Sequence, residues 1–152
     1  MNKIIKQRKL GGFTLLELMI VVVIIGILSA LGYPSYMQYV VSTKRTAATS
    51  VLLQVADRQQ QFFMDNKTFT ADMTNLGFPA SPLVVGDDGR SLASGDAKSV
   101  YTISMSNVGV TTYTITATPL HAQLSRDTEC GALTLDQSLA KGAGGAVADC
   151  WR

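Results

Sequence analysis

The chain has 152 residues, of which 16% are charged, and its formal net charge is +2 at neutral pH. Residues 1–12 hold Lys3, Lys6, Arg8 and Lys9 and no acid, which leaves 9 Lys and Arg against 11 Asp and Glu, a balance of −2 (9 − 11), after Gly12. The basic leader accounts for the positive charge, so the composition argues against a strongly basic, nucleic-acid-binding body.

An apolar run of 19 residues, 13–31, follows the basic leader. This length is close to that of a membrane-spanning helix and exceeds the apolar core of an ordinary secretory signal. No small-residue cleavage site follows the run, whereas Gly11 and Gly12 lie directly before it. Positive charge on the uncut side predicts that the leader lies in the cytoplasm and that the residues after the run lie outside.

Glu17 is the one carboxylate in this apolar run. An ionised carboxylate in hydrocarbon costs about 2.5–3.5 kcal/mol even on lenient insertion scales, so a helix that served only as an anchor should avoid it. Glu17 is expected to meet a cation elsewhere in an assembly, to neutralise its own chain's amine, or to be protonated in place.

From residue 33 to about residue 64 the sequence becomes amphipathic, which predicts that the helix continues for roughly 50 residues, or about 75 Å. Gln38, Arg45, Thr49 and Gln60 fall on its polar side. Gly26 and the step to Pro34 are expected to break the helix or make it flexible, or else to be a tolerated kink. The apolar face is predicted to hold Tyr36, Val40, Ala47, Val51, Val55 and Phe62.

Residues 66–99 are rich in turn formers and predict a long irregular connection with one short strand at 83–85. Period-two segments follow, and the turn at 107–109 makes the first two of them an antiparallel hairpin. The predicted fold class is therefore α+β, with the helix laid across a small antiparallel sheet. The inward-facing residues are Tyr101, Ile103 and Met105, then Tyr113, Ile115 and Ala117, and finally Leu133 and Leu135.

Cys130 and Cys150 are the two cysteines of the chain. Outside the cytosol an even count at this separation favours one disulfide, and two unrelated free thiols are the alternative. Trp151 is expected to pack over the bridge. A metal site is disfavoured because the chain has one His and no CxxC pair.

No residue constellation supports an enzyme, and no cofactor is expected. His121 falls in a predicted loop, where a surface role is favoured over catalysis. Lys44 and Arg45 follow the membrane segment and are expected to lie on a solvated face or to contact lipid headgroups.

The stretch "GGFTLLELMIVVVIIGILSALGYPSY" resembles the signal and N-terminal helix of type IV pilins and of the related pseudopilins of type II secretion. The downstream stretches "YTITATPL", "DTECGALTLDQ" and "ADCW" resemble PilE-like minor pilins. The resemblance implies a type IV pilin fold with a C-terminal disulfide loop. It also implies a cleaved leader at 1–12, a transmembrane and assembly half at 13–32, and a periplasmic or extracellular head at 33–152.

The same resemblance implies that prepilin peptidase acts at Gly12 and that Phe13 becomes the N-methylated first residue. Glu17 would then meet the N-terminal amine of a neighbouring subunit, where the helix dipole also favours an anion. The implied partners are major and minor pilins, prepilin peptidase, the inner-membrane assembly machinery, and the membrane before assembly. The implied localisation is the inner membrane, single-pass with the N-terminus inside, and afterwards the extracellular pilus.

The favoured function is a structural minor pilin that helps to start pilus assembly and supports adhesion and twitching motility. The alternatives are a DNA-receptor pilin of the ComP type for natural transformation, or a type II secretion pseudopilin. DNA is a disfavoured partner because residues 101–152 hold Arg126, Lys141 and Arg152 against four acids, a balance of −1 (3 − 4), although a local basic patch could overturn this.

Overall fold

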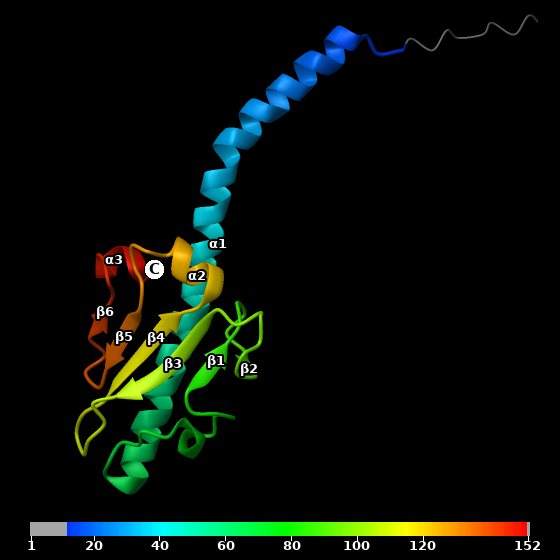
Figure 1. Cartoon of the computed structure of the whole chain (residues 1–152). Helices are drawn as coiled ribbons and strands as arrows, with labels where there is room; N and C mark the ends of the chain where they lie inside the picture. Colours follow the sequence, from blue (N-terminus) through cyan, green and yellow to red (C-terminus); the bar gives the residue numbers. More distant parts are fainter. Residues whose placement is uncertain (1–11, 152) are drawn as a thin grey trace, which may run out of the picture. The chain divides into compact units, whose positions relative to one another are not determined.

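The computed structural model describes residues 12–151 (Figure 1). The chain divides into two compact units, one ending at Met37 and the other beginning at Gln38. The predicted boundary at residue 33 lies a few residues earlier. Apart from Gly12, the predicted leader at 1–12 lies outside the described residues.

The described part of the N-terminal unit is the first half of helix α1, which spans Leu15–Asn66. Its apolar side chains are exposed along the whole segment, from Leu15 at 77% to Val21 at 46%. The described residues include one helix that is long and apolar enough to cross a membrane. Helical geometry continues through Gly26 and Pro34, and the flexibility expected at these positions stays a prediction.

The second unit has its own hydrophobic core, to which α1 contributes one face. Val51 and Val55 are buried as predicted, whereas Tyr36 is 64% exposed and was wrongly placed on the buried face. Thr49, predicted to be polar-facing, is buried because its hydroxyl donates to the carbonyl of Thr46 (2.9 Å) and so needs no water. The buried residues of α1 are Val41, Ala48, Thr49, Val51, Leu52, Val55, Ala56 and Gln59.

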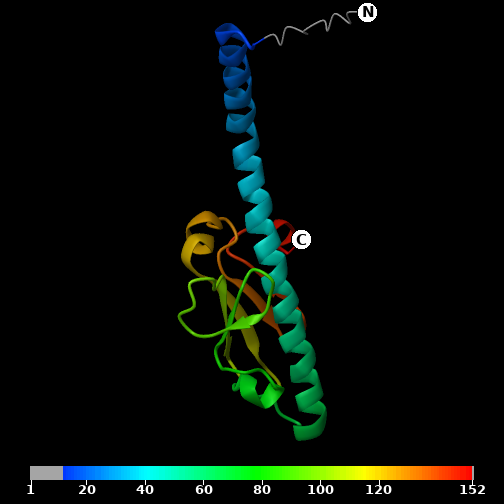
Figure 2. The same ribbon diagram turned by 90° about the vertical axis from the view of Figure 1, so that its right-hand side faces the viewer.

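A six-stranded antiparallel sheet packs against the C-terminal part of α1, as Figures 1 and 2 show. The strand order is β2-β1-β3-β4-β5-β6. The strands are β1 (Leu83–Val85), β2 (Ser91–Leu92), β3 (Tyr101–Ser106), β4 (Thr114–Pro119), β5 (Leu133–Asp136) and β6 (Lys141–Gly142).

The strand register brings the predicted inward-facing residues together. Ile103 lies opposite Ala117, and Ile115 lies opposite Leu135. All four are fully buried, as are Tyr101, Tyr113 and Leu133, while Met105 is half-buried against the core. The period-two pattern therefore gave the correct face of every central strand, and burying side chains of this size stabilises a fold by about 1.5–3 kcal/mol each.

The connection between α1 and the sheet is more ordered than the sequence predicts. It contains β1 where expected, but also β2 and a 3₁₀ helix, η1 (Met73–Leu76), capped by the Asp72 carboxylate. Buried Gln59 holds this segment on α1, because its amide pairs with both the carbonyl and the N–H of Thr70. The turn-forming residues of this connection show no hydrophobic periodicity that would predict β2 or η1. Strand pairing with β1 forms β2, and η1 depends on its cap.

The C-terminal segment carries two short helices, α2 (His121–Arg126) and α3 (Val147–Cys150). His121, predicted to lie in a loop, is instead the first residue of α2. The Cys130–Cys150 disulfide is present and buried in the core cluster. Trp151 packs against that cluster and donates its ring N–H to the carbonyl of Gly142 (3.0 Å).

Candidate functional site

The N-terminal end of α1 is capped by Thr14. Its hydroxyl accepts a hydrogen bond from the backbone N–H of Glu17 (3.2 Å), and its carbonyl accepts one from Leu18. Threonine followed three residues later by glutamate is the sequence pattern of a capping box. The capping role of Thr14 could therefore have been predicted from the sequence. Glu17 is exposed in the first turn, and no ion pair holds it among residues 12–151.

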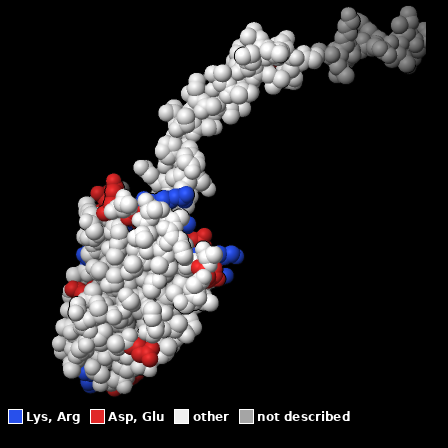
Figure 3. Space-filling view, viewed as in Figure 1, with Lys and Arg blue, Asp and Glu red and all other residues white. Residues whose placement is uncertain are grey.

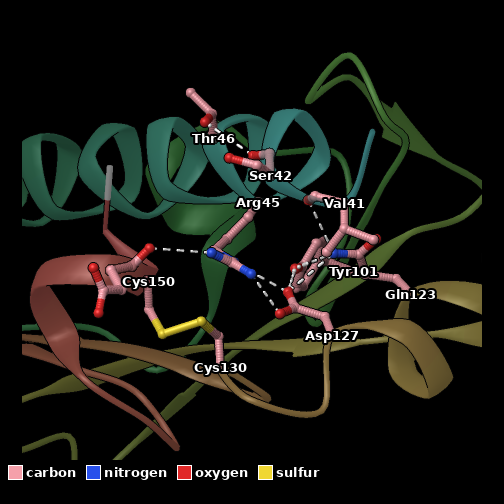
Figure 4. A network of polar contacts seen from close by, with 10 residues as sticks. Val41, Ser42, Arg45, Thr46, Tyr101, Gln123, Asp127, Cys130 and Cys150 are labelled. Carbon is pink, nitrogen blue, oxygen red and sulfur yellow. Dashed lines mark hydrogen bonds and ion pairs between the residues drawn. A yellow bond between two sulfur atoms is a disulfide. The ribbon is translucent and has the colours of Figure 1, made fainter. Parts of the chain in front are cut away.

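A buried polar network joins α1, β3 and α2 around Asp127 (Figure 4). The Arg45 guanidinium donates to both oxygens of the Asp127 carboxylate, at 2.6 and 3.1 Å. The Tyr101 hydroxyl and the Gln123 amide also donate to Asp127 Oδ2, at 3.2 and 3.0 Å. Arg45 was expected on a solvated face, but its side chain is only 14% exposed because the ion pair satisfies it.

Burial and charge shift the pKa values in this network. Burial alone lowers the pKa of Arg45, but the hydrogen bonds and negative charge of Asp127 outweigh it, so the net pKa is raised. Burial also raises the pKa of Tyr101 far above the ordinary tyrosine value. Both shifts keep Arg45 charged and Tyr101 neutral, which is the state that the hydrogen bonds require. The network is thus a structural tie between α1 and the C-terminal region.

A first cleft, of about 230 Å³, opens between α1, the β1–β2 turn, the β2–β3 connection and the start of α2. Lys44 and Lys98 supply its cations, and Asp87 supplies its carboxylate. Ser99 and His121 contribute polar side chains, and their Oγ and Nε2 atoms are 3.1 Å apart. The cleft therefore offers side-chain donors from α1, the β2–β3 connection and α2, and a carboxylate acceptor from the β1–β2 turn.

A second cleft, of about 450 Å³, lies farther along α1 and contains two arginines, Arg58 and Arg90. Among residues 12–151, no carboxylate lines this second cleft. Arg58 stacks over the Phe78 ring at 4.2 Å and donates to the carbonyl of Leu76 (2.8 Å), so its guanidinium is held in place. Arg90 is exposed and pairs loosely with Asp88 (3.4 Å).

The β1–β2 turn separates the two clefts and rests on α1. Gly89 has φ +75°, and a Cβ there would meet Val51 and the Ala47 carbonyl at 3.4 and 3.5 Å, so glycine suits both the backbone and the packing. Lys44, Val51 and Arg58 are seven residues apart and share one side of α1.

We call the four cations along this line, Lys44, Arg58, Arg90 and Lys98, the basic seam. Figure 3 shows charged atoms gathered beside the loops of β1 and β2, with acidic atoms among the basic ones, while the adjoining surface is mostly uncharged. Asp87 and Asp88 lie next to the seam. Asp96 also lies beside Lys98, and Asp65 lines a further pocket together with Arg58. Charge counted along the sequence missed this grouping because its members come from α1 and from two loops.

The predicted site residues do not form one catalytic centre. Gly12, Phe13 and Glu17 lie together at the start of α1, in the N-terminal unit. The cysteines lie in the second unit and are bonded to each other. Within residues 12–151, no three His, Cys, Asp or Glu side chains are grouped so that they could hold a metal ion.

Two family models match the chain. One, described as "Type IV minor pilin ComP, DNA uptake sequence receptor", matches residues 34–134. The other, described as "Prokaryotic N-terminal methylation motif", matches residues 7–33. The first range contains all four cations of the basic seam, and the second contains Gly12, Phe13 and Glu17.

Individual pilus proteins are also similar to this chain. A fimbrial protein of Pseudomonas aeruginosa is 32% identical over 134 residues, covering 71% of this chain and 87% of the relative. A probable minor fimbrial protein of Dichelobacter nodosus is 31% identical over 107 residues, covering 68% and 62%. The type IV major pilin PilE of Neisseria gonorrhoeae is 28% identical over 99 residues, covering 64% and 58%. With one long N-terminal helix, an antiparallel sheet and relatives of this extent, the chain belongs to the type IV pilin family.

Proposed function

We propose that this pilin is a minor subunit that receives DNA at the pilus surface during natural transformation. The observation that carries the proposal is the match of residues 34–134 to the model of the ComP DNA uptake sequence receptor. As a type IV pilin, the chain is a structural subunit and not an enzyme, inserted in the inner membrane before it joins the extracellular pilus.

The family match reverses the preference drawn from the sequence, which placed assembly initiation first. That preference counted charge over residues 101–152 and found a slight acidic excess. A DNA phosphate interacts with cations that lie close together in space, whatever their positions in the sequence. All four cations of the basic seam precede residue 101, so that count did not include them.

The basic seam has dimensions that suit one DNA strand. Lys44 and Arg58 are separated by 14 helical residues, or about 21 Å at 1.5 Å per residue. Phosphates follow one another every ~3.4 Å along the axis of each strand, so the seam spans about six of them. Arg58 is held by Phe78 and Leu76, which lowers the entropy lost when it pairs with a phosphate.

The N-terminal residues are proposed to act in processing and assembly. Prepilin peptidase cuts after Gly12, Phe13 is N-methylated, and the new amine of one subunit meets Glu17 of another. Support comes from the methylation-motif match over residues 7–33 and from the exposed Glu17 carboxylate in the first turn of α1. The proposed partners are other pilins, prepilin peptidase, the inner-membrane assembly machinery, and DNA.

A subunit that helps to start pilus assembly, and so supports adhesion and twitching, is the second candidate. The 31% identity to a probable minor fimbrial protein over 68% of this chain favours it. A deletion strain distinguishes the two functions. Loss of transformation with normal pilus number supports the receptor, whereas loss of pili supports the assembly subunit.

The direct test is a gel shift with the full mature chain in an uncharged detergent, at 50 and 200 mM salt. If the basic seam contacts about four phosphates, log K should fall against log salt with a slope near −3.6. Arg58→Gln with Arg90→Gln should weaken binding and reduce that slope by about 2. The matched control is Lys67→Gln with Lys141→Gln, which removes two exposed cations away from both clefts. Absence of salt-sensitive binding by the unaltered chain, with or without an uptake sequence, refutes the receptor function.

A further inference from the structure

The first cleft has features of a phosphate pocket that the family match does not describe. Lys44 and Lys98 line it from α1 and from the β2–β3 connection, and neither is held by an ion pair in the described part of the chain. Asp87, from the β1–β2 turn, is the one carboxylate among the described lining residues, which together carry a charge of +1 when His121 is neutral. A second carboxylate, Asp96, adjoins the lining because it accepts the backbone N–H of Lys98 at 2.8 Å.

His121 is oriented in this cleft by Ser99. The Ser99 side chain belongs to a buried residue, and its hydroxyl donates to the carbonyl of Asp96 at 2.6 Å. Its oxygen is then left to accept from His121 Nε2 at 3.1 Å, which puts the proton of the neutral ring on Nε2. Nδ1 is the remaining polar atom of the ring, and protonation turns it from an acceptor into a donor.

The backbone of His121 is also unusual. Its φ is +47°, a left-handed conformation that few residues other than glycine adopt. The residue is exposed and packs into no core, so burial does not explain its conformation. The structure therefore places an exposed imidazole beside two lysines that no ion pair holds within residues 12–151.

We propose that this cleft binds a backbone phosphate of DNA through Lys44, Lys98 and His121, and that protonation of His121 makes the binding pH-dependent. This inference rests on the DNA-receptor function proposed above. Protonation of His121 adds one positive charge, so the charge of the lining residues rises from +1 to +2. A bound phosphate attracts the protonated ring, and by linkage proton uptake accompanies binding.

The chain offers a clean test because His121 is its one histidine. The full mature chain, labelled with ¹³C-histidine in an uncharged detergent, gives one imidazole resonance to follow from pH 5 to 8.5. Saturating duplex DNA should raise the titration midpoint by about one pH unit. Such a shift corresponds to affinity about tenfold tighter at a pH well below both midpoints than at a pH well above them, at constant salt.

Substitutions of the cleft residues test whether the pH dependence of DNA binding arises in this cleft. His121→Asn should remove the pH dependence but keep the fold, since asparagine tolerates the left-handed backbone. Lys44→Gln or Lys98→Gln should weaken DNA binding at both pH values and reduce the midpoint shift. Lys141→Gln, an exposed cation on β6, is the matched control and should leave the shift unchanged.

The possible outcomes distinguish a failure of the phosphate pocket from a failure of the proposed DNA-receptor function. DNA binding with an unchanged His121 midpoint overturns the pocket but leaves the receptor function standing. A midpoint shift caused by millimolar inorganic phosphate, but not by duplex DNA, overturns the assignment of the pocket to DNA. No DNA binding at either pH refutes the receptor function itself.

Discussion

Arg45 of α1 and Asp127 at the end of α2 form a two-point ion pair, with nitrogen–oxygen distances of 2.6 and 3.1 Å, although they are 82 residues apart in the sequence. Arg45 also donates to the carbonyl of Asp149 at 3.2 Å, beside Cys150. The Arg45 guanidinium thereby connects α1 to the end of α2 and to α3, the helix that contains Cys150.

Asp127→Asn should destabilise the second unit by about 3–5 kcal/mol, because it leaves the Arg45 charge buried without a partner. Urea unfolding of the full chain in detergent measures this. Arg45→Met combined with Asp127→Leu should recover part of the loss, since it removes both charges. The control is Arg126→Met, which alters an exposed cation on the same helix. A change below 1 kcal/mol in Asp127→Asn would contradict the role given to the pair.

Stability should fall at alkaline pH because of Tyr101. Burial raises its pKa, so above about pH 10 the unfolded chain loses a proton that the folded chain keeps. The stabilisation is complete below that pH and is lost as the pH rises toward the folded pKa. Unfolding curves at pH 9 to 11.5, with tyrosinate absorbance as the second signal, measure this loss.

Tyr101→Phe should make the alkaline limb flatter while lowering stability at neutral pH through the lost hydrogen bonds. Part of the alkaline loss should persist, because burial also raises the pKa of Tyr113. An unchanged alkaline slope in Tyr101→Phe would show that other groups control it.

Removing the Cys130–Cys150 bridge should cost about 3 kcal/mol, the value expected for a loop closed over 20 positions. Trp151 is the one tryptophan of the chain and packs beside the bridge, so its fluorescence reports the same event. We expect reduction, or Cys130→Ser with Cys150→Ser, to lower the melting temperature and shift Trp151 emission to longer wavelength. Equal melting temperatures with and without reductant would argue against a stabilising disulfide.

Glu17→Ala should leave membrane insertion and leader cleavage intact but reduce incorporation into sheared filaments at least roughly tenfold. The physical reason is that an unpartnered buried amine costs about 3–5 kcal/mol in a filament core. Thr14→Ser, which keeps the helix cap at the same turn, is the control. Incorporation of Glu17→Ala at the unaltered level would refute the assembly contact.

Gly12→Leu should leave the leader attached, because the cut proposed there needs a small residue. A side chain at Gly12 would meet nothing within 4 Å, so the substitution does not disturb the described fold. Mass spectrometry should then show the protein heavier by the 12-residue leader. A normally processed product would remove Gly12 from the cleavage site.

Local patterns predicted much of this protein correctly. Alternation at Ile103 and Ile115 identified the buried face of the sheet, and the helical repeat at Val51 and Val55 identified the face of α1 that packs on it. These predictions succeeded because the spacing of side chains along one element depends on that element's own geometry. The same reasoning wrongly placed Tyr36, since periodicity alone does not say where packing begins.

The sequence by itself determined the pilin class, through the leader, the apolar run and the carboxylate within it. These features depend only on residues that are consecutive in the chain, so no tertiary structure is needed to recognise them. Only the tertiary structure decided that Arg45 is a buried tie while its neighbour Lys44 lines an open cleft. It also decided that Lys44, Arg58, Arg90 and Lys98 gather along one seam of a chain with a slight acidic excess after its leader. Charge acts over a few ångströms of space, and that distance is set by the packing of the β1–β2 turn on α1.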